Sequence, residues 1–448
     1  MRRLCAIGAL VCGLATVVVA LVVLWSAWRE LLFVAVAAAV ACTAAWYVLS
    51  RAGAVRWIAA LVAVAAVVAA VVVWAGDNNI LGVIVVLVLA YATGHLSQLA
   101  LRADARSLQA EAPPGERMPR PQHPVLLCNP RSGGGKANAA FVAAAHERGV
   151  ETVMLEPGLD LVALTRDAVA RGADALGAAG GDGTQAIVAE IAAEHDLPFV
   201  CIPAGTRNHF ALDLGVDRDD VIGALDAFVD GYERRVDLAR VNDRVFVNNV
   251  SFGVYAEIVQ SPDYRDDKMG TASKLLPEML GPGYAPFDLE LDGPAGVGRS
   301  RPDLVLVSNN VYRLSGIGGF GTRLRLDEGV LGVIVVDVKS PADLTQLVAL
   351  EAAGAGARFS GWREWSTPDV EIRSGSTVNA GIDGEAVTLD APVRLSTWPG
   401  ALRVRIAPHH PGLSPAAIVH RVRAGGPGRL VRIASGRERE PGSAVPAG

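Results

Sequence analysis

The chain has 448 residues, of which 51% are hydrophobic, a share that is unusual for a wholly soluble enzyme. It is long enough for two or three domains, since a single hydrophobic core rarely grows beyond ~250–300 residues. Its formal net charge is −5 and its aromatics are sparse, with no basic stripe among them. This composition gives no electrostatic basis for binding nucleic acid, so none is expected as a partner.

The hydrophobic excess is concentrated near the N-terminus, in four apolar runs. These runs are Leu4–Trp25, Leu31–Leu49, Trp57–Ala75 and Ile80–Ala92 with its continuation. Most of them approach the ~20 residues that a helix needs to cross a bilayer core. Residues 1–101 are therefore predicted to form a module of four transmembrane helices. A cleaved signal peptide would explain only the first run, and four buried helices of a soluble protein remain the alternative.

The charges between these runs predict the orientation. The loops on one side carry Arg2, Arg3, Arg51, Arg56, Arg102 and Arg106, whereas the other side holds only the Arg29–Glu30 pair and Asp77. Because Lys and Arg accumulate on the cytoplasmic side, the N-terminus and everything after residue 102 are predicted to be cytoplasmic, in a multi-pass protein of the cell membrane. The five cysteines include no CxxC pair, which is typical of reduced, buried thiols.

Residues 102–123 are polar and rich in proline, so they are predicted to be a juxtamembrane linker.

The next segment repeats one pattern three times: a short apolar strand, a glycine-rich turn and a helix. The strands are Val125–Cys128, Ala173–Ala179 and Phe199–Ile202, and the helices are Ala137–Arg148, Gln185–His195 and His209–Leu214. The repeat predicts a parallel α/β sheet over residues 124–235. Ligands bind beyond the carboxyl ends of such strands, and glycine turns followed by helix N-termini suit phosphates. Three of these turns at one sheet edge predict a polyphosphate site.

Each turn alone has an ordinary explanation. The first is not a Walker A loop, because Pro130 stands where its leading glycine would be. Asp182 can belong to a simple turn with a helix cap, and Thr206 and Asn208 can cap the short helix that follows them.

The three turns read Asn129-Pro130…Ser132-Gly133, Gly180-Gly181-Asp182-Gly183-Thr184 and Gly205-Thr206-Arg207-Asn208-His209-Phe210-Ala211. Together they resemble the diacylglycerol kinase catalytic-domain family of lipid kinases, over residues 124–408. The GGDGT element is the most specific part of the resemblance. NAD kinases and phosphofructokinases share a related signature, so this element alone does not identify a substrate.

The resemblance implies an α/β nucleotide domain related to those of NAD kinase and phosphofructokinase, a β-sandwich domain, and an active site between them. It implies ATP contacts from Asn129, Pro130, Arg131, Ser132, Gly133, Gly181, Asp182, Gly183, Thr184, Gln185, Thr206 and Asn208. Asp182 is also expected to help hold a Mg²⁺ ion that bridges the phosphates, and so to serve catalysis.

From residue 236 to 399 the pattern changes to short β-rich runs between turns, which predicts a mostly antiparallel sandwich. The runs are Val236–Val241, Arg244–Val250, Leu304–Val307, Leu331–Val338, Asp369–Ile372 and Ala386–Leu389. The resemblance implies that this is the lipid-substrate domain and that residues 400–408 return to the first domain.

Residues Asn379–Glu385 look like the family's Asp-Gly-Glu element, which implies that Glu385 is the proton acceptor. Phosphoryl transfer to an alcohol needs positioning, charge neutralisation and a carboxylate that takes the hydroxyl proton. The residues alone leave open an ordinary Asp-Gly hairpin turn with an exposed glutamate.

Asp327-Glu328-Gly329 stands where the family usually has Asp-Asp-Gly, a structural Mg²⁺ site. Carried over, the ligands would be Glu328 and the carbonyl groups of Arg325 and Val330. Glutamate adds a methylene, so a plain turn is the alternative.

Three further segments complete the chain. Lys268-Met269-Gly270 and Lys274 fall where the family has basic residues near the cleft. Gly316–Gly321 fits GxGxxG by letter, but an alternating run and no helix follows it. Residues 409–448 are predicted to be a disordered basic tail, with anionic lipid head groups as one partner.

These features predict an integral-membrane, ATP-dependent lipid kinase that converts diacylglycerol to phosphatidic acid. A kinase for another lipid alcohol, such as a sphingoid base or phosphatidylglycerol, is the nearest alternative. Arg207, His209 and Glu328 depart from the family pattern, so a non-catalytic nucleotide-binding membrane sensor also stays open. The sequence leaves open whether the protein forms a homodimer.

Overall fold

The structure is a computed structural model. It describes residues 2–26, 28–50, 54–75, 79–110, 114–253, 287–294, 299–300, 302–313, 322–338, 340, 343, 346–347, 350, 356–423 and 426–435. The predictions for Lys268-Met269-Gly270, Lys274 and Gly316–Gly321 lie outside the described residues.

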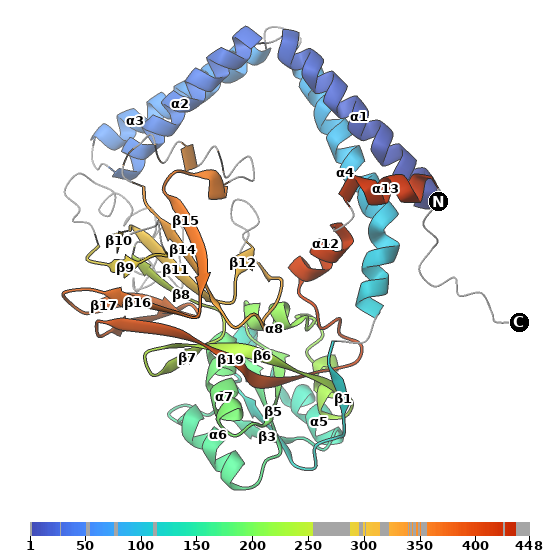
Figure 1. Cartoon of the computed structure of the whole chain (residues 1–448), viewed down its shortest axis with the longest axis vertical. Helices are drawn as coiled ribbons and strands as arrows, with labels where there is room; N and C mark the ends of the chain where they lie inside the picture. The colour runs from blue at the N-terminus through green and yellow to red at the C-terminus, as the bar shows by residue number, and fades with distance from the viewer. Residues whose placement is uncertain are drawn as a thin grey trace, which may run out of the picture.

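Four apolar helices begin the chain. They are α1 (Arg2–Ser26), α2 (Trp28–Ser50), α3 (Ala54–Ala75) and α4 (Asn79–Ala110). Helix α1 packs on α4 and α2 packs on α3, and the two pairs diverge from one another (Figure 1). Two stretches, Arg3–Ser26 and Ala54–Val73, are long and apolar enough to cross a membrane, whereas the apolar stretches of α2 and α4 are shorter. Only 6% of either long window is buried, so neither is the core helix of a soluble domain.

The linker differs from its prediction. Helix α4 continues to Ala110, and Glu116–Met118 form a short strand, β1, that pairs with β6 (Gly231–Val241). Residues 102–110 are mostly Ala, Arg, Leu and Gln, which favour helix, and the first proline of the segment comes only at position 113. The helix therefore takes up the first part of the predicted linker.

The segment after residue 124 forms a parallel sheet. Its strands, in spatial order, are β3 (Glu151–Met154), β2 (Pro124–Cys128), β4 (Ala175–Gly180), β5 (Pro198–Pro203) and the last part of β19 (Val393–Ile406). Every residue of β2, β4 and β5 is buried, as expected where helices cover both faces of a sheet. The helical elements of this region are η1 (Ser132–Gly134), α5 (Ala139–Glu147), α6 (Leu161–Ala170), α7 (Asp182–Glu194), α8 (His209–Leu214) and η2 (Gly223–Phe228). The three predicted strand–turn–helix units are present, and β3 with α6 forms one that the sequence prediction omitted.

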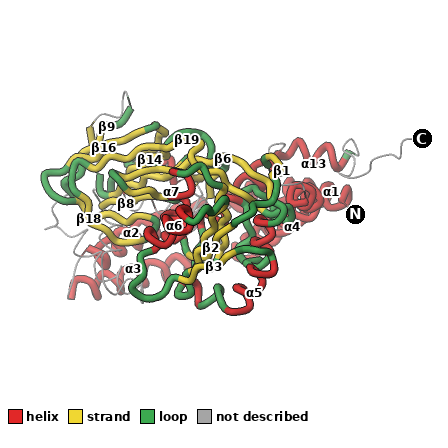
Figure 2. Tube along the Cα trace, turned by 90° about the horizontal axis from the view of Figure 1, so that it is seen from below, coloured by secondary structure: helices red, strands yellow, loops and turns green. Residues whose placement is uncertain are grey.

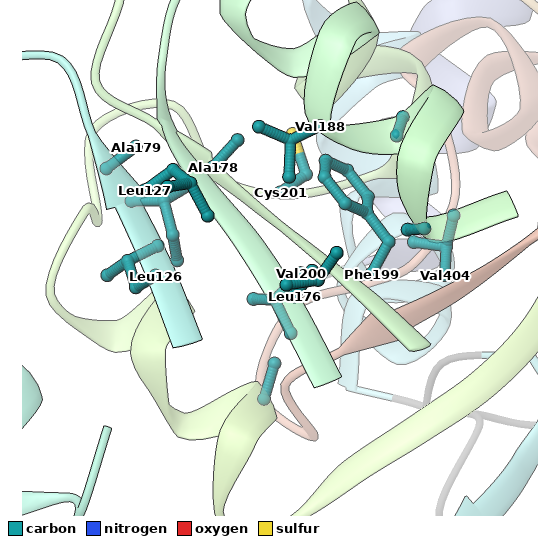
Figure 3. Close-up of a cluster of buried hydrophobic side chains, with 14 of the residues drawn as sticks. Leu126, Leu127, Leu176, Ala178, Ala179, Val188, Phe199, Val200, Cys201 and Val404 are labelled. Atoms are coloured by element: carbon teal, nitrogen blue, oxygen red, sulfur yellow. The ribbon is translucent and has the colours of Figure 1, made fainter. Parts of the chain in front are cut away.

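The strands of this sheet enclose a closely packed core (Figure 3). Leu126, Leu176 and Phe199 come from adjacent strands and are fully buried. Two free cysteines lie in the same core, and burial raises the pKa of the Cys128 thiol to about 12. Both Cys128 and Cys201 are thus buried, unpaired thiols, as the sequence predicts.

The second region is a sandwich of antiparallel strands. One sheet has the order β15 (Trp362–Thr367), β14 (Leu331–Val336), β11 (Leu304–Asn309), β8 (Asn249–Gly253), β17 (Val378–Ile382) and β18 (Glu385–Leu389). The facing strands are β10 (Arg299–Ser300), β9 (Glu290–Asp292), β16 (Asp369–Arg373), β19, β6 and β7 (Arg244–Phe246). Phe252 and Val307 of the first sheet share one core with Phe246 and Leu395 of the second. Figure 2 shows β16 and β19 in one layer and β14 and β8 in the next.

The two regions share a sheet. The predicted return of residues 400–408 to the first domain is confirmed by the pairing of β19 with β5, whereas a single sheet through both regions was not anticipated. Strand β19 pairs with β16 at its beginning, with β6 along its length, and in parallel with β5 at Arg403 and Val404. One eleven-stranded sheet therefore runs through both regions, although each has its own hydrophobic core. The continuous sheet thus connects the two cores through β19 and β6.

The C-terminal segment is only partly as predicted. Residues that were expected to be disordered form α12 (Pro415–Arg423) and α13 (Gly426–Ala434), so the prediction is wrong for this stretch. Ser414 caps α12 by accepting a hydrogen bond from the Ala417 N–H at 3.1 Å, and Ile433 is buried against the N-terminal helices. Packing against a neighbour stabilises these short helices where composition alone does not.

Candidate active site

The three glycine turns lie against one another. A Cβ atom added at Gly133 would clash with the backbone carbonyl of Ala204, and one added at Gly205 would clash with the Cα atom of Gly181. Gly133 also has a left-handed φ of 56°. Only glycine allows these approaches, so the turns after β2, β4 and β5 converge on one place.

The first turn is tied to the second by Asn129. Its side-chain amide donates to Thr184 Oγ1 at 3.2 Å, and its Oδ1 accepts from the Arg131 N–H at 3.1 Å. Pro130, Arg131 and Ser132 follow at the surface or half-buried, where a ligand can reach their backbone. This part of the prediction is compatible with phosphate contacts.

Two side chains that the sequence assigns to ATP are instead buried in the protein. The Gln185 amide donates to the carbonyls of Ala178 and Ile202 at 2.8 and 2.9 Å, which clamps β4 to β5. Asn208 donates to the Gly205 carbonyl at 2.8 Å and accepts from the Gly205 N–H at 2.9 Å. Both side chains position the turns, while exposed Thr206 lies at the tip of the third turn.

Asp182 of the GGDGT turn caps α8. Its two carboxylate oxygens accept from the backbone N–H groups of His209 and Phe210, at 3.2 and 3.1 Å. Asn208, at the N-cap position, makes no capping bond of its own, so Asp182 supplies the cap from another element. The carboxylate is half-buried, and each oxygen keeps further lone pairs for a ligand. Burial lowers the pKa of His209, although the charges of Asp182 and Asp213 act in the opposite direction. His209, one of the departures from the family pattern, therefore adds an imidazole ring whose neutral form is favoured.

Glu385 reaches the same turn from the β region. It begins β18, directly after a tight turn in which Asp383 and Gly384 have φ values of 48° and 86°. A Cβ atom added at Gly183 would lie 2.5 Å from Glu385 Oε1, so the carboxylate rests on the GGDGT turn. The predicted base and the predicted nucleotide turn are thus neighbours.

Arg244 of β7 completes this part of the site. Its Nη2 lies 2.7 Å from Glu385 Oε2, and the two side chains are 41% and 51% exposed. The guanidinium therefore fixes one carboxylate oxygen while solvent and a ligand can still reach the pair. Sequence reasoning missed Arg244, because nothing near it in the chain indicates a partner 141 residues away.

A buried carboxylate anchors the hairpin. Asp383 accepts from the N–H groups of Val247, Asn248 and Asn249 at 2.9, 2.8 and 3.1 Å. Burial raises the pKa of Asp383 to about 7, and the charge of Asp182 adds to the shift, although the three hydrogen bonds oppose it. Asp383 thus positions Glu385, a role that the sequence analysis did not assign.

A second buried group, also missed, connects α8 to the β region. Arg323 is fully buried and its Nε lies 2.7 Å from Asp213 Oδ2 on α8. The guanidinium also donates to the carbonyls of Val247 and Asn309, at 2.7 and 2.8 Å. This ion pair holds the third nucleotide turn and the β7–β8 connection in one register.

The predicted magnesium turn is closed by protein groups. Arg325 is paired with Asp327 at 2.8 Å, and its hydrogen bond is the main cause that lowers the pKa of that carboxyl. The Val330 carbonyl accepts from the Asn310 N–H at 3.0 Å, and the Glu328 N–H donates to Asn310 Oδ1 at 2.9 Å. A guanidinium beside the turn repels a cation, so the set of Arg325, Glu328 and Val330 fits Mg²⁺ poorly and stays only a prediction.

One other cluster has metal-binding residue types. Ligating atoms of Asp220, His409 and His410 lie within 4.8 Å of one another. However, His410 Nδ1 accepts from the Asp217 N–H at 3.1 Å, which leaves the proton of the neutral ring on Nε2. Neither nitrogen then offers a free lone pair, so His410 does not suit a metal.

Comparison with known proteins agrees with this geometry. Residues 123–241 match the family model described as the diacylglycerol kinase catalytic domain. This segment is similar to a diacylglycerol kinase catalytic domain. All three turns of the lipid kinase domain lie inside the matched segment, whereas Glu385 and Asp383 lie beyond it.

Two curated relatives cover more of the lipid kinase. A diacylglycerol kinase of Mycobacterium tuberculosis is 28% identical over 301 residues, which are 64% of this chain and 95% of that protein. A Pseudomonas aeruginosa protein named "Probable lipid kinase YegS-like" is 29% identical over 296 residues, or 63% and 93%. The activity class is therefore lipid kinase.

A solved structure shows the same fold. The crystal structure of a candidate diacylglycerol kinase from Bacillus anthracis aligns with a TM-score of 0.52 and 18% identity, over 67% of this chain and 98% of that one. This similarity supports the α/β and β arrangement described above.

Proposed function

We propose that the protein transfers the γ-phosphoryl group of ATP to the hydroxyl group of diacylglycerol, giving phosphatidic acid. One observation carries the proposal: the Glu385 carboxylate, from the β region, lies on Gly183 of the turn that meets the other two nucleotide turns. A site with this arrangement holds the phosphates on one side and a proton acceptor on the other.

The nucleotide side works through backbone groups. The turns after β2, β4 and β5 bring N–H groups and the N-termini of α7 and α8 to one sheet edge, where they stabilise the phosphate charge. Asp182 would hold Mg²⁺ with its remaining lone pairs, and the ion, when bound, would neutralise charge on the phosphates. Because Asp182 also caps α8, the same carboxylate aligns the third turn with the second.

The acceptor side works through Glu385. Its carboxylate takes the proton of the lipid hydroxyl as the new P–O bond forms and the bond from the γ-phosphorus to the bridging oxygen of ADP breaks. ADP leaves with that oxygen, and the carboxylate then passes the proton to solvent. Arg244 holds Oε2, which leaves Oε1 directed toward the Gly183 turn. The pair therefore sets both the position and the direction of the base.

The membrane helices bring this site to its substrate. In the proposal all of α1 to α4 cross the bilayer, with the N-terminus and the kinase region cytoplasmic. Exposed apolar side chains along these helices support lipid contact, because the described part of the protein leaves them uncovered. Confinement beside a lipid substrate raises its effective concentration without any new contact.

Diacylglycerol is favoured over other lipid alcohols only by the names of the family model and of relatives, so the substrate needs a direct test. Membranes that contain the purified protein are incubated with γ-labelled ATP and a panel of diacylglycerol, a sphingoid base and phosphatidylglycerol. Labelled phosphatidic acid is the expected product. Label in another lipid would show that this lipid is the substrate instead of diacylglycerol. Nucleotide binding without any labelled lipid would indicate a non-catalytic sensor instead of a kinase.

A further inference from the structure

The C-terminal helix α13 lies across two of the apolar helices. Ile433 of α13 is 3% exposed and packs with Ala6 of α1 and Ala100 of α4. Arg3 Nε donates to the Ala434 carbonyl at 2.7 Å, which caps the last turn of α13 with a cation. Figure 1 shows α13 crossing α1 and α4 close to the N-terminus.

These contacts place α13 at a particular level of the helical module. The long apolar window of α1 begins at Arg3, and the apolar stretch of α4 ends at Ser97. Ala6 and Ala100, which Ile433 contacts, lie within one turn of these two boundaries. Two separate helices thus give the same result: α13 lies where the apolar spans meet polar sequence.

The segment between residues 411 and 435 is basic, whereas the chain as a whole is acidic. It contains four arginines, Arg421, Arg423, Arg429 and Arg432, and no Asp or Glu, in a chain whose net charge is −5. Arg429 and Arg432 stand three residues apart in the sequence of α13, and Leu430, Ile433 and Ala434 form its apolar face. Arg432 is exposed, and the apolar face packs with the N-terminal helices.

The neighbouring ends of α1 and α4 carry the same charge. Arg2 and Arg3 precede the α1 span, and Arg102 and Arg106 follow the α4 span, with Asp104 as the only acid among these residues. Each Lys or Arg near an anionic membrane surface contributes on the order of 1 kcal/mol to the binding free energy at physiological salt. The attraction fades within about a Debye length of the surface.

We propose that α13, with the adjoining ends of α1 and α4, forms a binding surface for the anionic head groups of the cytoplasmic leaflet. In this arrangement α13, with its exposed Arg432, extends the basic boundary of the spans sideways over the membrane. The segment also ties the membrane to the kinase region, since Ser414 donates to the Arg323 carbonyl and the Ala416 N–H donates to Thr322 Oγ1 at 3.0 Å. The proposal concerns lipid binding and does not depend on which lipid is phosphorylated.

The test uses the full chain in phosphatidylcholine nanodiscs with a small fraction of spin-labelled lipid. Electron spin resonance gives the fraction of the labelled lipid whose motion the protein restricts, and this fraction is compared for phosphatidylglycerol and phosphatidylcholine. The wild-type protein should prefer phosphatidylglycerol, and Arg429→Gln with Arg432→Gln should reduce this preference by about fivefold per arginine removed. The preference of the wild type should also fall as NaCl rises from about 50 mM to about 500 mM.

The matched control is Arg166→Gln with Arg171→Gln, which removes two exposed arginines from α6, far from the membrane helices (Figure 1). It should keep the full preference. A wild-type protein without preference, or with one that salt does not change, would overturn the proposal even if the α13 variant failed to fold. Full preference in a folded α13 variant would also overturn it.

Discussion

The two sides of the site are built in different ways. The nucleotide side consists of three turns from consecutive strand–turn–helix units, in which glycines and backbone groups do the work. The acceptor side consists of side chains from distant strands: Glu385 and Asp383 of one hairpin, and Arg244 of β7. A local pattern therefore reveals the first side in the sequence, whereas the second exists only once the sheets have assembled.

Breaking the connection between the two sides should have the largest effect. Arg323→Met leaves the Asp213 carboxylate buried without its partner, which should lower the free energy of unfolding by about 3–5 kcal/mol. Denaturant unfolding of the variant in detergent measures this change. Asp213→Asn combined with Arg323→Met removes the unpaired charge and should recover part of the loss. A stability change below ~1 kcal/mol for the single variant would show that the pair does not hold the two sides together.

Breaking the convergence of the turns should come next. Gly205→Ala places a methyl group against the Gly181 backbone, so the second and third turns must separate. ATP affinity should fall by at least ~10-fold, and stability by roughly 1–3 kcal/mol, as for other overpacked sites. Isothermal titration with a non-hydrolysable ATP analogue measures the affinity. Gly134→Ala is the control, since open space surrounds that position and only its φ of 73° is strained; equal losses in both variants would argue against the convergence.

The acceptor side should respond to pH through Asp383. Its pKa in the folded protein is about 7, against 3.8 as the ordinary value. A raised pKa means that the folded state binds the proton more tightly, so this stabilisation is complete below pH ~4 and is lost as pH rises through about 7. The melting temperature of the wild type should therefore fall across this range more than that of Asp383→Asn. Parallel curves for the two proteins would remove Asp383 as the source.

The exposed ion pair of the acceptor side should matter least for stability. Arg244→Gln removes a partner that is 41% exposed, so the free energy of unfolding should change by less than ~1 kcal/mol. Turnover should still fall several-fold, because Glu385 loses the group that directs it, while ATP affinity stays the same. Arg394→Gln, in the exposed pair with Glu371, is the matched control and should leave turnover unchanged. Equal turnover in the two variants would make the Arg244 contact incidental.

The same contrast explains what the sequence could predict. The strands at Val125–Cys128 and Phe199–Ile202 were found because continuous apolar runs end in glycine turns. The buried side chains of Gln185 and Asn208 could not be foreseen, because a polar residue in a phosphate-type turn looks the same whether it contacts a ligand or clamps two strands. Partners separated by 110 residues, as in Asp213 and Arg323, leave no local pattern.

The membrane end gives a similar lesson. Composition predicted disorder for residues 409–448, since Gly, Pro and Arg are abundant there. Residues 415–423 and 426–434 are nevertheless helical, and the apolar side chains of α13 pack on α1 and α4. Such packing depends on a surface more than 300 residues away in the chain, which no local reading contains.

The central claim is that a proton acceptor faces a nucleotide held by three turns. It is tested most directly by measuring ATP affinity and lipid phosphorylation on one preparation of Glu385→Gln. We expect unchanged affinity and a turnover lower by roughly 10²–10⁴-fold, as for the loss of a general base. Wild-type turnover would contradict the account, and so would an equal loss of affinity and turnover, since the carboxylate would then serve nucleotide binding.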